Sequence, residues 1–329
     1  MSDVFAYGVG LAHHRADGAV LDCLFPTPRM GVADATLSDI QAGTTTLQPE
    51  EAARLNERVP GSVADALLET DRPLTCVKLT ADGEITSTAE AYLKLHLLSH
   101  RLAVPNSLNL DNIFTHLPNL AWTNKGPIEV DKLTDALLRA RLRDEPLEVM
   151  AVDKFPKMVN YVMPSGVRIA DASRIRLGAY LGDGTTVMHE GFVNFNAGAM
   201  GPNMVEGRIS QGVVIEAGTD LGGSASTMGT LSGGGEIKIT LGKNCLVGAN
   251  AGTGIPLGDR CTIEAGLYIT AGTVISLYDE FGNSVRRVKG RELAGGDDML
   301  FIRNSQTGEV MCRTNRQAIE LNESLHAHN

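Results

Sequence analysis

Glu206, Gly207 and Arg208 are the adjacent residues of this sequence best suited to chemistry. A carboxylate and a guanidinium stand on either side of a glycine, whose missing side chain lets another molecule approach the backbone closely. A carboxylate in such a place can act as a general acid or base, or as a nucleophile. The segment from Ala199 to Arg208 also interrupts a sequence repeat, and an insertion without function is an equally good interpretation of it.

A second candidate is the basic cluster of Arg286, Arg287, Lys289 and Arg291 in an otherwise acidic chain. Arginine and lysine form strong hydrogen bonds with phosphate oxygens. Taken alone, such a cluster is more often the solvated face of a hairpin. It therefore indicates an anion site only if other residues point to a phosphorylated ligand.

Spacing excludes three familiar kinds of site. His189 is the one histidine of the repeat region, whereas a zinc site of the carbonic-anhydrase type needs three. The glycine run at 233–235 lacks the Gly-Lys-Ser/Thr sequence of a phosphate loop, and it is either a flexible loop or room for a ligand. Gly8 and Gly10 are not followed by a third glycine at the spacing of a dinucleotide-binding fold.

Composition narrows the class of protein. The 329 residues allow two or three domains, and 29 basic against 39 acidic residues give a net charge of −10. This balance argues against a nucleic-acid binder. No apolar run approaches the length of a membrane span, and the N-terminus lacks the pattern of a signal peptide. Five scattered cysteines without a Cys-x-x-Cys pair predict reduced thiols in a cytoplasmic protein.

Aliphatic residues recur every six positions between residues 169 and 275. The leading positions are Ile169, Ile175, Leu181, Val187, Val193, Ile209, Ile215, Leu221, Leu241, Val247, Leu257, Ile263, Ile269 and Ile275. A period of six fits neither an amphipathic helix nor a half-buried strand, and it indicates a β-solenoid whose stacked coils share one apolar column. Glycines and other small residues allow the tight corners. The three breaks in phase predict short loops inserted at corners.

The flanking segments predict two further domains. Residues 1–155 indicate an α/β domain, with strands at 12–25 and 75–80 and helices after Pro49, after Ser87 and at 131–143. Turn residues at 279–283 and 305–308 predict a small antiparallel cap, followed by a short helix at 320–325. The expected domains are therefore 1–155, 156–276 and 277–329.

Several long motifs carry a family resemblance. Residues 187–198, 204–210 and 228–235, together with 291–293 and 303–305, resemble the tetrahydrodipicolinate N-succinyltransferases, a family of hexapeptide-repeat acyltransferases. The similarity is greatest to the longer branch known from actinobacteria and pseudomonads, and it runs from about residue 155 to the C-terminus. The resemblance implies a mainly β fold, in which a left-handed parallel β-helix follows an N-terminal α/β domain and precedes a small C-terminal antiparallel β cap.

The resemblance also implies an activity and its residues. The family transfers succinyl from succinyl-CoA to the amino group of ring-opened tetrahydrodipicolinate, in the succinylase route to diaminopimelate and lysine, as a homotrimer with active sites between subunits. Glu206 matches the active-site glutamate, which either forms a transient acyl anhydride or accepts the proton of the attacking amine. The positions that match acyl-CoA contacts are Arg208, Gly223, Ser226, Ala249, Glu264, Ala265, Gly272, Lys289, Ile302, Arg303, Asn304 and Ser305.

A metal site is implied less completely. Family members hold a cation on the trimer axis with an aspartate and a glutamate from each subunit, and Mg²⁺ is the candidate ion. Glu190 matches the glutamate, whereas Ser173 stands at the position of the aspartate. A structural or crystal-borne ion is as good an interpretation as a functional one.

Two other functions are compatible with the repeat. A hexapeptide acyltransferase could use acetyl-CoA on a related amino acid or sugar. A non-enzymatic β-solenoid could serve only for assembly, but regular, uninterrupted coils would be expected of it. The breaks in the repeat, one of them ending in Glu206 to Arg208, favour the succinyltransferase.

Overall fold

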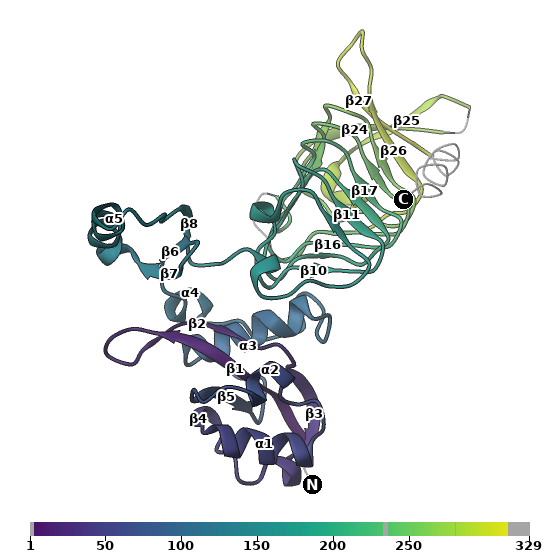
Figure 1. The fold of residues 1–329 in the computed structure, drawn as a ribbon. Helices are drawn as coiled ribbons and strands as arrows, with labels where there is room; N and C mark the ends of the chain where they lie inside the picture. Colours follow the sequence, from purple (N-terminus) through teal and green to yellow (C-terminus); the bar gives the residue numbers. More distant parts are fainter. Residues whose placement is uncertain (1–2, 233–235, 280, 315–329) are drawn as a thin grey trace. The chain divides into compact units, whose positions relative to one another are not determined.

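The chain forms two compact units in a computed structural model (Figure 1), which describes residues 3–232, 236–279 and 281–314. The first unit comprises Met1–Ala103 and Ser107–Val162, and the second comprises Val104–Asn106 and Met163–Asn329. Mainly parallel β structure in the second unit, an α/β first unit and antiparallel pairs near the C-terminus confirm the predicted fold class. The helix predicted at 320–325 lies outside the described residues.

The first unit is built on a five-stranded antiparallel sheet. Its strands are β1 (Asp3–His14), β2 (Val20–Leu24), β3 (Arg29–Ala33), β4 (Gly43–Leu47) and β5 (Leu74–Leu79). The predicted strand at 75–80 is confirmed as β5. The single strand predicted at 12–25 is wrong, because the chain reverses between β1 and β2. Gly18 adopts a positive φ of 86° in that turn, where a side chain would be strained.

The helices of the first unit are α1 (Pro49–Arg58), α2 (Asp65–Leu68), α3 (Thr88–Ser99), α4 (Ile113–His116) and α5 (Leu133–Leu142). The three helices predicted in this unit are present as α1, α3 and α5, whereas α2 and α4 were not predicted. The Ser87 side chain accepts a hydrogen bond from the Glu90 N–H, as an N-cap should. The Glu90 carboxylate accepts hydrogen bonds from Thr86 and not from the Ser87 N–H, so the two residues form only half of a capping box.

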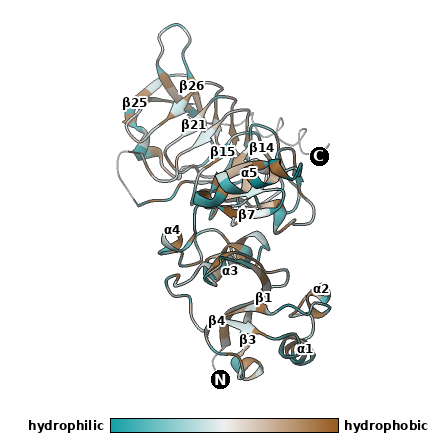
Figure 2. Cartoon of the chain, turned by 60° about the vertical axis from the view of Figure 1, so that its left-hand side comes forward, coloured by the Kyte–Doolittle hydropathy of each residue, from teal (hydrophilic) through white to brown (hydrophobic). Residues whose placement is uncertain are grey.

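A small three-stranded sheet follows within the first unit. It consists of β6 (Leu120–Thr123), β7 (Gly126–Glu129) and β8 (Val149–Asp153), with α5 between β7 and β8. The leucines of α5 are only partly buried, since Leu138 and Leu142 are exposed. Helix α5 accordingly carries both hydrophilic and hydrophobic residues in Figure 2.

The second unit is a parallel β-helix with three faces, here called the first, second and third sheets. The first sheet contains β9 (Arg168–Ile169), β11 (Thr185–Val187), β14 (Asn203–Val205), β17 (Asp220–Leu221), β20 (Leu246–Val247) and β22 (Thr262–Ile263). The second sheet contains β12 (Phe192–Val193), β15 (Arg208–Ile209), β18 (Ser226–Thr227), β21 (Gly252–Thr253) and β23 (Tyr268–Ile269). The third sheet contains β10 (Tyr180–Leu181), β13 (Gly198–Ala199), β16 (Val214–Ile215) and β19 (Thr240–Leu241).

The predicted leading residues are buried, as the period of six requires, except Ile169 on the first coil, which is only partly buried. Inserted loops were expected at all three breaks in phase, but two of the three breaks have another cause. Ala199, Val205, Thr227 and Thr253 also occupy inward positions and are fully buried, so the repeat continues through them. The corners between Val205 and Ile209 and between Thr253 and Leu257 are shortened to four residues. Only the segment between β18 and β19 is an insertion.

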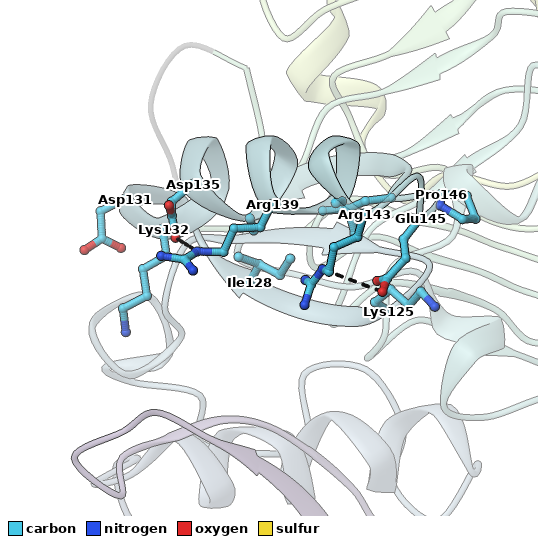
Figure 3. Close-up of a pocket in the computed structure, with 12 residues that line it drawn as sticks. Lys125, Ile128, Asp131, Lys132, Asp135, Arg139, Arg143, Glu145 and Pro146 are labelled. Atoms are coloured by element: carbon cyan, nitrogen blue, oxygen red, sulfur yellow. Dashed lines mark hydrogen bonds and ion pairs between the residues drawn. The ribbon is translucent and has the colours of Figure 1, made fainter.

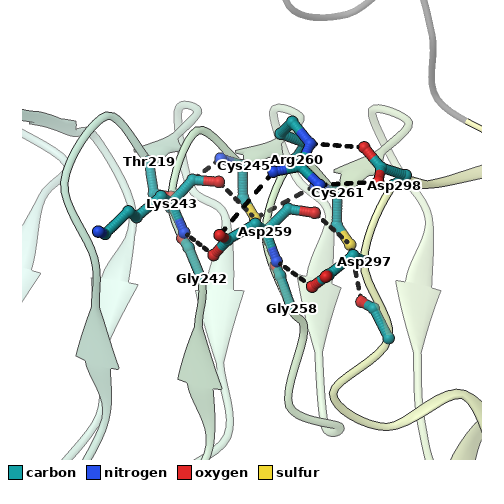
Figure 4. Close-up of polar contacts among 11 residues, drawn as sticks. Thr219, Gly242, Lys243, Cys245, Gly258, Asp259, Arg260, Cys261, Asp297 and Asp298 are labelled. Carbon is teal, nitrogen blue, oxygen red and sulfur yellow. Dashed lines mark hydrogen bonds and ion pairs between the residues drawn. The ribbon is translucent and has the colours of Figure 1, made fainter.

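A column of small polar side chains lines one inner corner (Figure 4). Thr219, Cys245 and Cys261 stand at the fifth hexad position, and each side chain donates a hydrogen bond to a carbonyl of the next turn: Gly242, Gly258 and Gly296. Contact with Cys245 and burial raise the pKa of the Cys261 thiol. The five cysteines are unbridged and buried, which confirms the expectation of reduced thiols.

The C-terminal strands continue the first sheet. They are β24 (Val274–Tyr278), β25 (Ser284–Lys289), β26 (Met299–Arg303) and β27 (Val310–Thr314). The predicted turns at 279–283 and 305–308 connect the antiparallel pairs β24–β25 and β26–β27. Both β24–β27 and β22–β26 are parallel pairs, however, so the cap is mixed and bonded directly to the β-helix. Within the described ranges, no helix is long and apolar enough to cross a membrane.

One polar cluster in the first unit responds to pH. The buried Asp22 carboxylate accepts hydrogen bonds from the His13 ring at 2.7 Å and from the Tyr161 hydroxyl. The hydrogen bond to Asp22 raises the pKa of His13 above its usual 6.5. Protonated His13 therefore stabilises the fold below pH 6.5, and this contribution is lost as the pH rises through the raised pKa.

We expect the melting temperature to fall as the pH rises from about 6 to about 8, and His13→Asn to flatten this dependence. The measurement is thermal unfolding of both proteins across that range. His14→Asn, at the exposed neighbouring position, serves as the matched control and should keep the wild-type slope. An unchanged slope in His13→Asn would assign the dependence to another group.

Candidate active site

Glu206 lies directly after β14, at the corner between the first and second sheets. Its N–H donates to the Leu221 carbonyl at 2.8 Å, and its own carbonyl accepts from the Ser224 N–H at 3.0 Å. Both backbone groups are thus held by the next coil, while the side chain is partly exposed. The backbone at Glu206 is fixed and its carboxylate is accessible, as a reacting carboxylate requires.

Buried Asn203 fixes the strand that carries Glu206. Its amide oxygen accepts from the Gly201 N–H at 2.6 Å, and its amide nitrogen donates to the carbonyls of Glu216 and Thr219. Sequence reasoning missed this residue because it lies in the segment taken as an inserted loop. The signal was an asparagine two residues before Val205, where the inward hexad position continues.

Gly223 lies under the Glu206 carboxylate. A Cβ atom built on Gly223 would stand 3.7 Å from Glu206 Oε2, with no other atom within 4 Å. At Gly222 the situation differs, because a Cβ there would lie 2.7 Å from the Ala249 backbone nitrogen. Gly222 is therefore needed for the stacking of the coils, whereas Gly223 leaves open space beside the carboxylate.

The structure gathers several predicted acyl-CoA residues at this same corner. Equivalent turns of successive coils place Glu206, Gly223, Ala249 and Ala265 in a column, which we call the Glu206 corner. The column is held by backbone hydrogen bonds from Asn250 N–H to Gly223 and from Gly266 N–H to Ala249. Ala249 and Ala265 are exposed, so the column is open to a ligand along its length.

The C-terminal strands extend the corner. The Glu264 N–H donates to Phe301, and the Glu264 carboxylate accepts from the Arg303 N–H at 2.7 Å. Predicted residues Ile302 and Arg303 lie at the end of β26, and Asn304 and Ser305 follow in the turn. These four residues therefore adjoin Glu264 at one end of the Glu206 corner.

The outer face of the second sheet begins beside the corner. Arg208 and Ser226 are register partners on β15 and β18, and Arg208 Nη2 donates to Ser226 Oγ at 2.7 Å. Two predicted contact residues are thus joined by a direct hydrogen bond. The guanidinium of Arg208 is fixed next to the backbone turn that bears Glu206.

Two predicted residues lie at another corner. Gly272 is exposed in the turn after β23, and Lys289 pairs with Val274 where β25 ends. These residues follow the second sheet, whereas the Glu206 corner follows the first. The basic cluster around Lys289 is exposed, and Arg287 approaches Glu309 at 3.9 Å.

Residues of one chain do not fit a metal ion. The Ser173 hydroxyl and N–H both donate to the Asp171 carboxylate, and these bonds lower the pKa of Asp171. The described residues contain no group of three His, Cys, Asp or Glu side chains that could hold a metal. Glu190 is exposed and supplies one carboxylate only, so no step of the reaction is derived from a metal.

A pocket in the first unit contains none of the predicted residues (Figure 3). It encloses about 510 Å³ beside α5 and β7. Arg139 pairs with Asp135 at 2.6 Å, and Arg143 approaches Glu145 at 3.6 Å, along its lining. Because these charges are largely paired with each other, the pocket offers no group poised for chemistry.

We expect Gly223→Ala to fold normally but to lower turnover at least about tenfold, because its methyl group would occupy the space beside the Glu206 carboxylate. Gly222→Ala should instead lower the melting temperature, since its Cβ would meet backbone. Circular dichroism melts and steady-state kinetics of the pair test this difference. Wild-type turnover in Gly223→Ala would show that the ligand does not use this space.

Comparison with known proteins agrees with this geometry. The family models described as "Tetrahydrodipicolinate N-succinyltransferase middle" and "Hexapeptide repeat of succinyl-transferase" match residues 117–157 and 238–271. Enzymes named 2,3,4,5-tetrahydropyridine-2,6-dicarboxylate N-succinyltransferase are similar over nearly the whole chain. The one from Pseudomonas aeruginosa is 54% identical over 98% of both chains, and the one from Vibrio cholerae is 49% identical over 99% of both.

A solved structure agrees as well. The crystal structure of a proposed 2,3,4,5-tetrahydropyridine-2-carboxylate N-succinyltransferase from Campylobacter jejuni superimposes with a TM-score of 0.85 at 30% identity. The match covers 97% of this chain and 94% of the other. With half of its residues identical to those of enzymes from two genera, and with the same fold, the chain belongs to the tetrahydrodipicolinate N-succinyltransferase family.

Proposed function

We propose that the chain transfers succinyl from succinyl-CoA to the amino group of ring-opened tetrahydrodipicolinate with Glu206 at the reacting centre. N-succinyl transfer in diaminopimelate and lysine biosynthesis is the activity of the family. The observation that carries the assignment to Glu206 is the open column of small residues that begins at its carboxylate. Acyl transfer needs such access for a long, thin donor.

Backbone groups at the corner support acyl transfer. A thioester carbonyl becomes an oxyanion when an amine attacks it, and preorganised N–H groups stabilise that charge. Within the described residues, the Gly223 N–H donates no hydrogen bond, whereas the neighbouring Gly222 and Ser224 N–H groups do. The Gly223 N–H is therefore available for the oxyanion beside Glu206.

The donor would follow the Glu206 corner toward the C-terminal strands. Gly223, Ala249 and Ala265 would let the pantetheine arm lie against the backbone. Glu264 and residues 302–305 would contact it farther on. The exposed basic cluster with Lys289, which lies at the other corner, would bind its phosphates from a neighbouring subunit. Gly272 adjoins Lys289 in this arrangement.

We further propose a homotrimer whose active sites lie between subunits. The exposure of Ala249, Glu264 and Ala265 supports this proposal, because one chain would then provide only one wall of the donor site. A neighbouring β-helix would provide the second wall and exclude water from the reacting atoms. Mg²⁺ at Glu190 on the trimer axis would need ligands from three subunits. The site is proposed to work in the cytoplasm, where succinyl-CoA is available.

Glu206 has two chemical roles compatible with this position. As a general base, it would take the proton from the attacking amine while thiolate leaves the thioester. As a nucleophile, it would expel the thiolate and form a mixed anhydride, which the amine then opens. The two roles differ in when CoA is released as free thiol: the nucleophile releases it without the acceptor, whereas the general base requires the acceptor.

Thiol release from succinyl-CoA, with and without tetrahydrodipicolinate, tests the activity and the role together. Release that needs the acceptor supports the succinyltransferase with a general base, and a single-turnover burst without it supports the anhydride. Acetyl-CoA run in parallel tests the alternative donor. No release from either donor by a well-folded protein would favour the non-enzymatic β-solenoid.

We expect Glu206→Gln to lower turnover by about 10²- to 10⁴-fold, because the amide can neither accept the proton nor attack the thioester. Oligomeric state and CoA affinity should remain unchanged, as measured by light scattering and calorimetry. Glu264→Gln is the matched control on the same corner, and it should change the Michaelis constant for the acyl-CoA rather than kcat. A wild-type rate in Glu206→Gln would remove Glu206 from the mechanism.

We expect Lys289→Ala to raise the Michaelis constant for succinyl-CoA several-fold and to leave that for the acceptor unchanged, since Lys289 would meet phosphate alone. Steady-state kinetics at varied donor and acceptor concentrations measure both constants. The effect should shrink at high salt, as for any exposed charge. Equal changes in both constants would mean that the cap positions the whole site instead.

A further inference from the structure

A column of side chains runs along the outer face of the second sheet, past Glu206. Register pairs join Phe192 to Arg208 and Arg208 to Ser226. Arg174 ends the 3-10 helix Ala172–Arg174 and stands beside Phe192, because the following residue, Ile175, bridges to Val193. The column therefore reads Arg174, Phe192, Arg208 and Ser226 from the N-terminal to the C-terminal coils.

The Arg174 guanidinium is held in place by neutral groups. Its Nε donates to the Gly191 carbonyl at 3.2 Å, and its Nη2 donates to the Glu190 carbonyl at 3.0 Å. Its Cζ atom lies 5.9 Å from the centre of the Phe192 ring. Within the described residues its Nη1 donates no hydrogen bond. The guanidinium is fixed in position, while its positive charge and its Nη1 donor can still interact with a ligand.

The direction of the donor decides what this ligand is. Along the Glu206 corner, the predicted donor contacts occupy the coils that follow Glu206 toward the C-terminus. The thioester carbonyl must reach Glu206, so the acceptor must approach from the other side, across the coils that precede Glu206. Phe192 lies one strand step before Arg208, and Arg174 lies two. Both residues stand on the acceptor's side.

The reach of the acceptor fits this spacing. Two strand steps amount to about 10 Å at about 4.8 Å each. With bonds of about 1.5 Å, the distance from the reacting amine of a seven-carbon 2-amino dicarboxylate to its far carboxylate is roughly 6–7 Å. An ion pair with that carboxylate adds about 3 Å. An amine at Glu206 would thus place the far carboxylate at Arg174.

We propose that Arg174 binds the distal carboxylate of the acceptor and so selects a dicarboxylate over a monocarboxylate. The inference rests on the proposed function, because it takes Glu206 as the reacting centre. Phe192 supports the guanidinium and packs against the methylene groups of the acceptor. Arg208, bonded to Ser226, stays with the donor.

The surrounding charges make this cation necessary. Glu190 is exposed on the corner one coil before Glu206 and would repel a carboxylate. Asp171, bonded to Ser173, lies close enough for Arg174 to help lower its pKa. Arg176 also lies 5.9 Å from the Phe192 ring, but its Nη1 donates to the Asn194 side chain. Arg174 differs in that, within the described residues, its two hydrogen bonds go to backbone carbonyls and its Nη1 makes none.

The test compares two acceptors that differ only at the far end, 2-aminoheptanedioate and 2-aminoheptanoate. Arg174→Gln should lower kcat/KM for the dicarboxylate about 10- to 100-fold, the range for losing one charge-assisted hydrogen bond. It should leave the monocarboxylate rate and the Michaelis constant for succinyl-CoA unchanged. Arg174→Lys, which keeps the charge, should recover part of the loss.

Arg168→Gln is the matched control, because Arg168 is exposed on the same coil but belongs to the first sheet. It should behave as wild type with both acceptors. Equal losses with both acceptors in Arg174→Gln would show that Arg174 only supports the coil, and unchanged rates would show that it does not meet the acceptor. Either result overturns the proposal while leaving the succinyltransferase intact. If wild-type protein succinylates neither tetrahydrodipicolinate nor the two analogues, the proposed function itself fails.

Discussion

The backbone hydrogen bonds between stacked coils are the interaction on which the rest of this molecule depends. Each inward aliphatic residue is register partner to the one a coil away, as Val205 is to Leu221 and Leu221 is to Val247. The same bonds hold the corners, where the chain turns from one sheet to the next. A single coil could neither bury its aliphatic residues nor fix its corner, so the position of every site residue is a property of the stack.

This dependence explains why catalysis can be built at a corner rather than in a deep cleft. The corner backbone is as well fixed as a strand, but its side chains and N–H groups point away from the core. Glu206 has both backbone groups engaged by the next coil, and its partly exposed carboxylate lies beside Gly223. Asn203, buried at the start of the same strand, removes the remaining freedom. The short corner after Val205 places Arg208 within two residues of the reacting carboxylate.

Much of the fold could be predicted from the sequence, because inward positions of a solenoid must be apolar and recur with the coil. Apart from Val205, which follows Ala199 in the same missed stretch, the prediction failed where the inward residue was not a large aliphatic one. Ala199, Thr227 and Thr253 are buried, but a search for aliphatic leads passes over them, so shortened corners were mistaken for insertions. Glu206 could be found from the local pattern Glu-Gly-Arg. The sequence could not show which of the distant glycines lie at the same corner as Glu206, because this depends on the length of each coil. Gly223 lies at that corner, whereas Gly272 lies at another.

A periodic scaffold also imposes a direction on the reaction. Successive coils at one corner stand about 5 Å apart, so the length of a ligand that lies along the corner determines how many coils it contacts. If the donor and the acceptor meet at Glu206 as proposed, they extend to opposite sides of it, because both cannot occupy the same part of the corner. The residues on the two sides differ accordingly: small residues and backbone toward the C-terminal strands, and a fixed guanidinium on an aromatic ring toward the N-terminal coils. A fixed guanidinium on the N-terminal side, and small residues beside Glu206 on the C-terminal side, would let the same column of coils distinguish the two substrates.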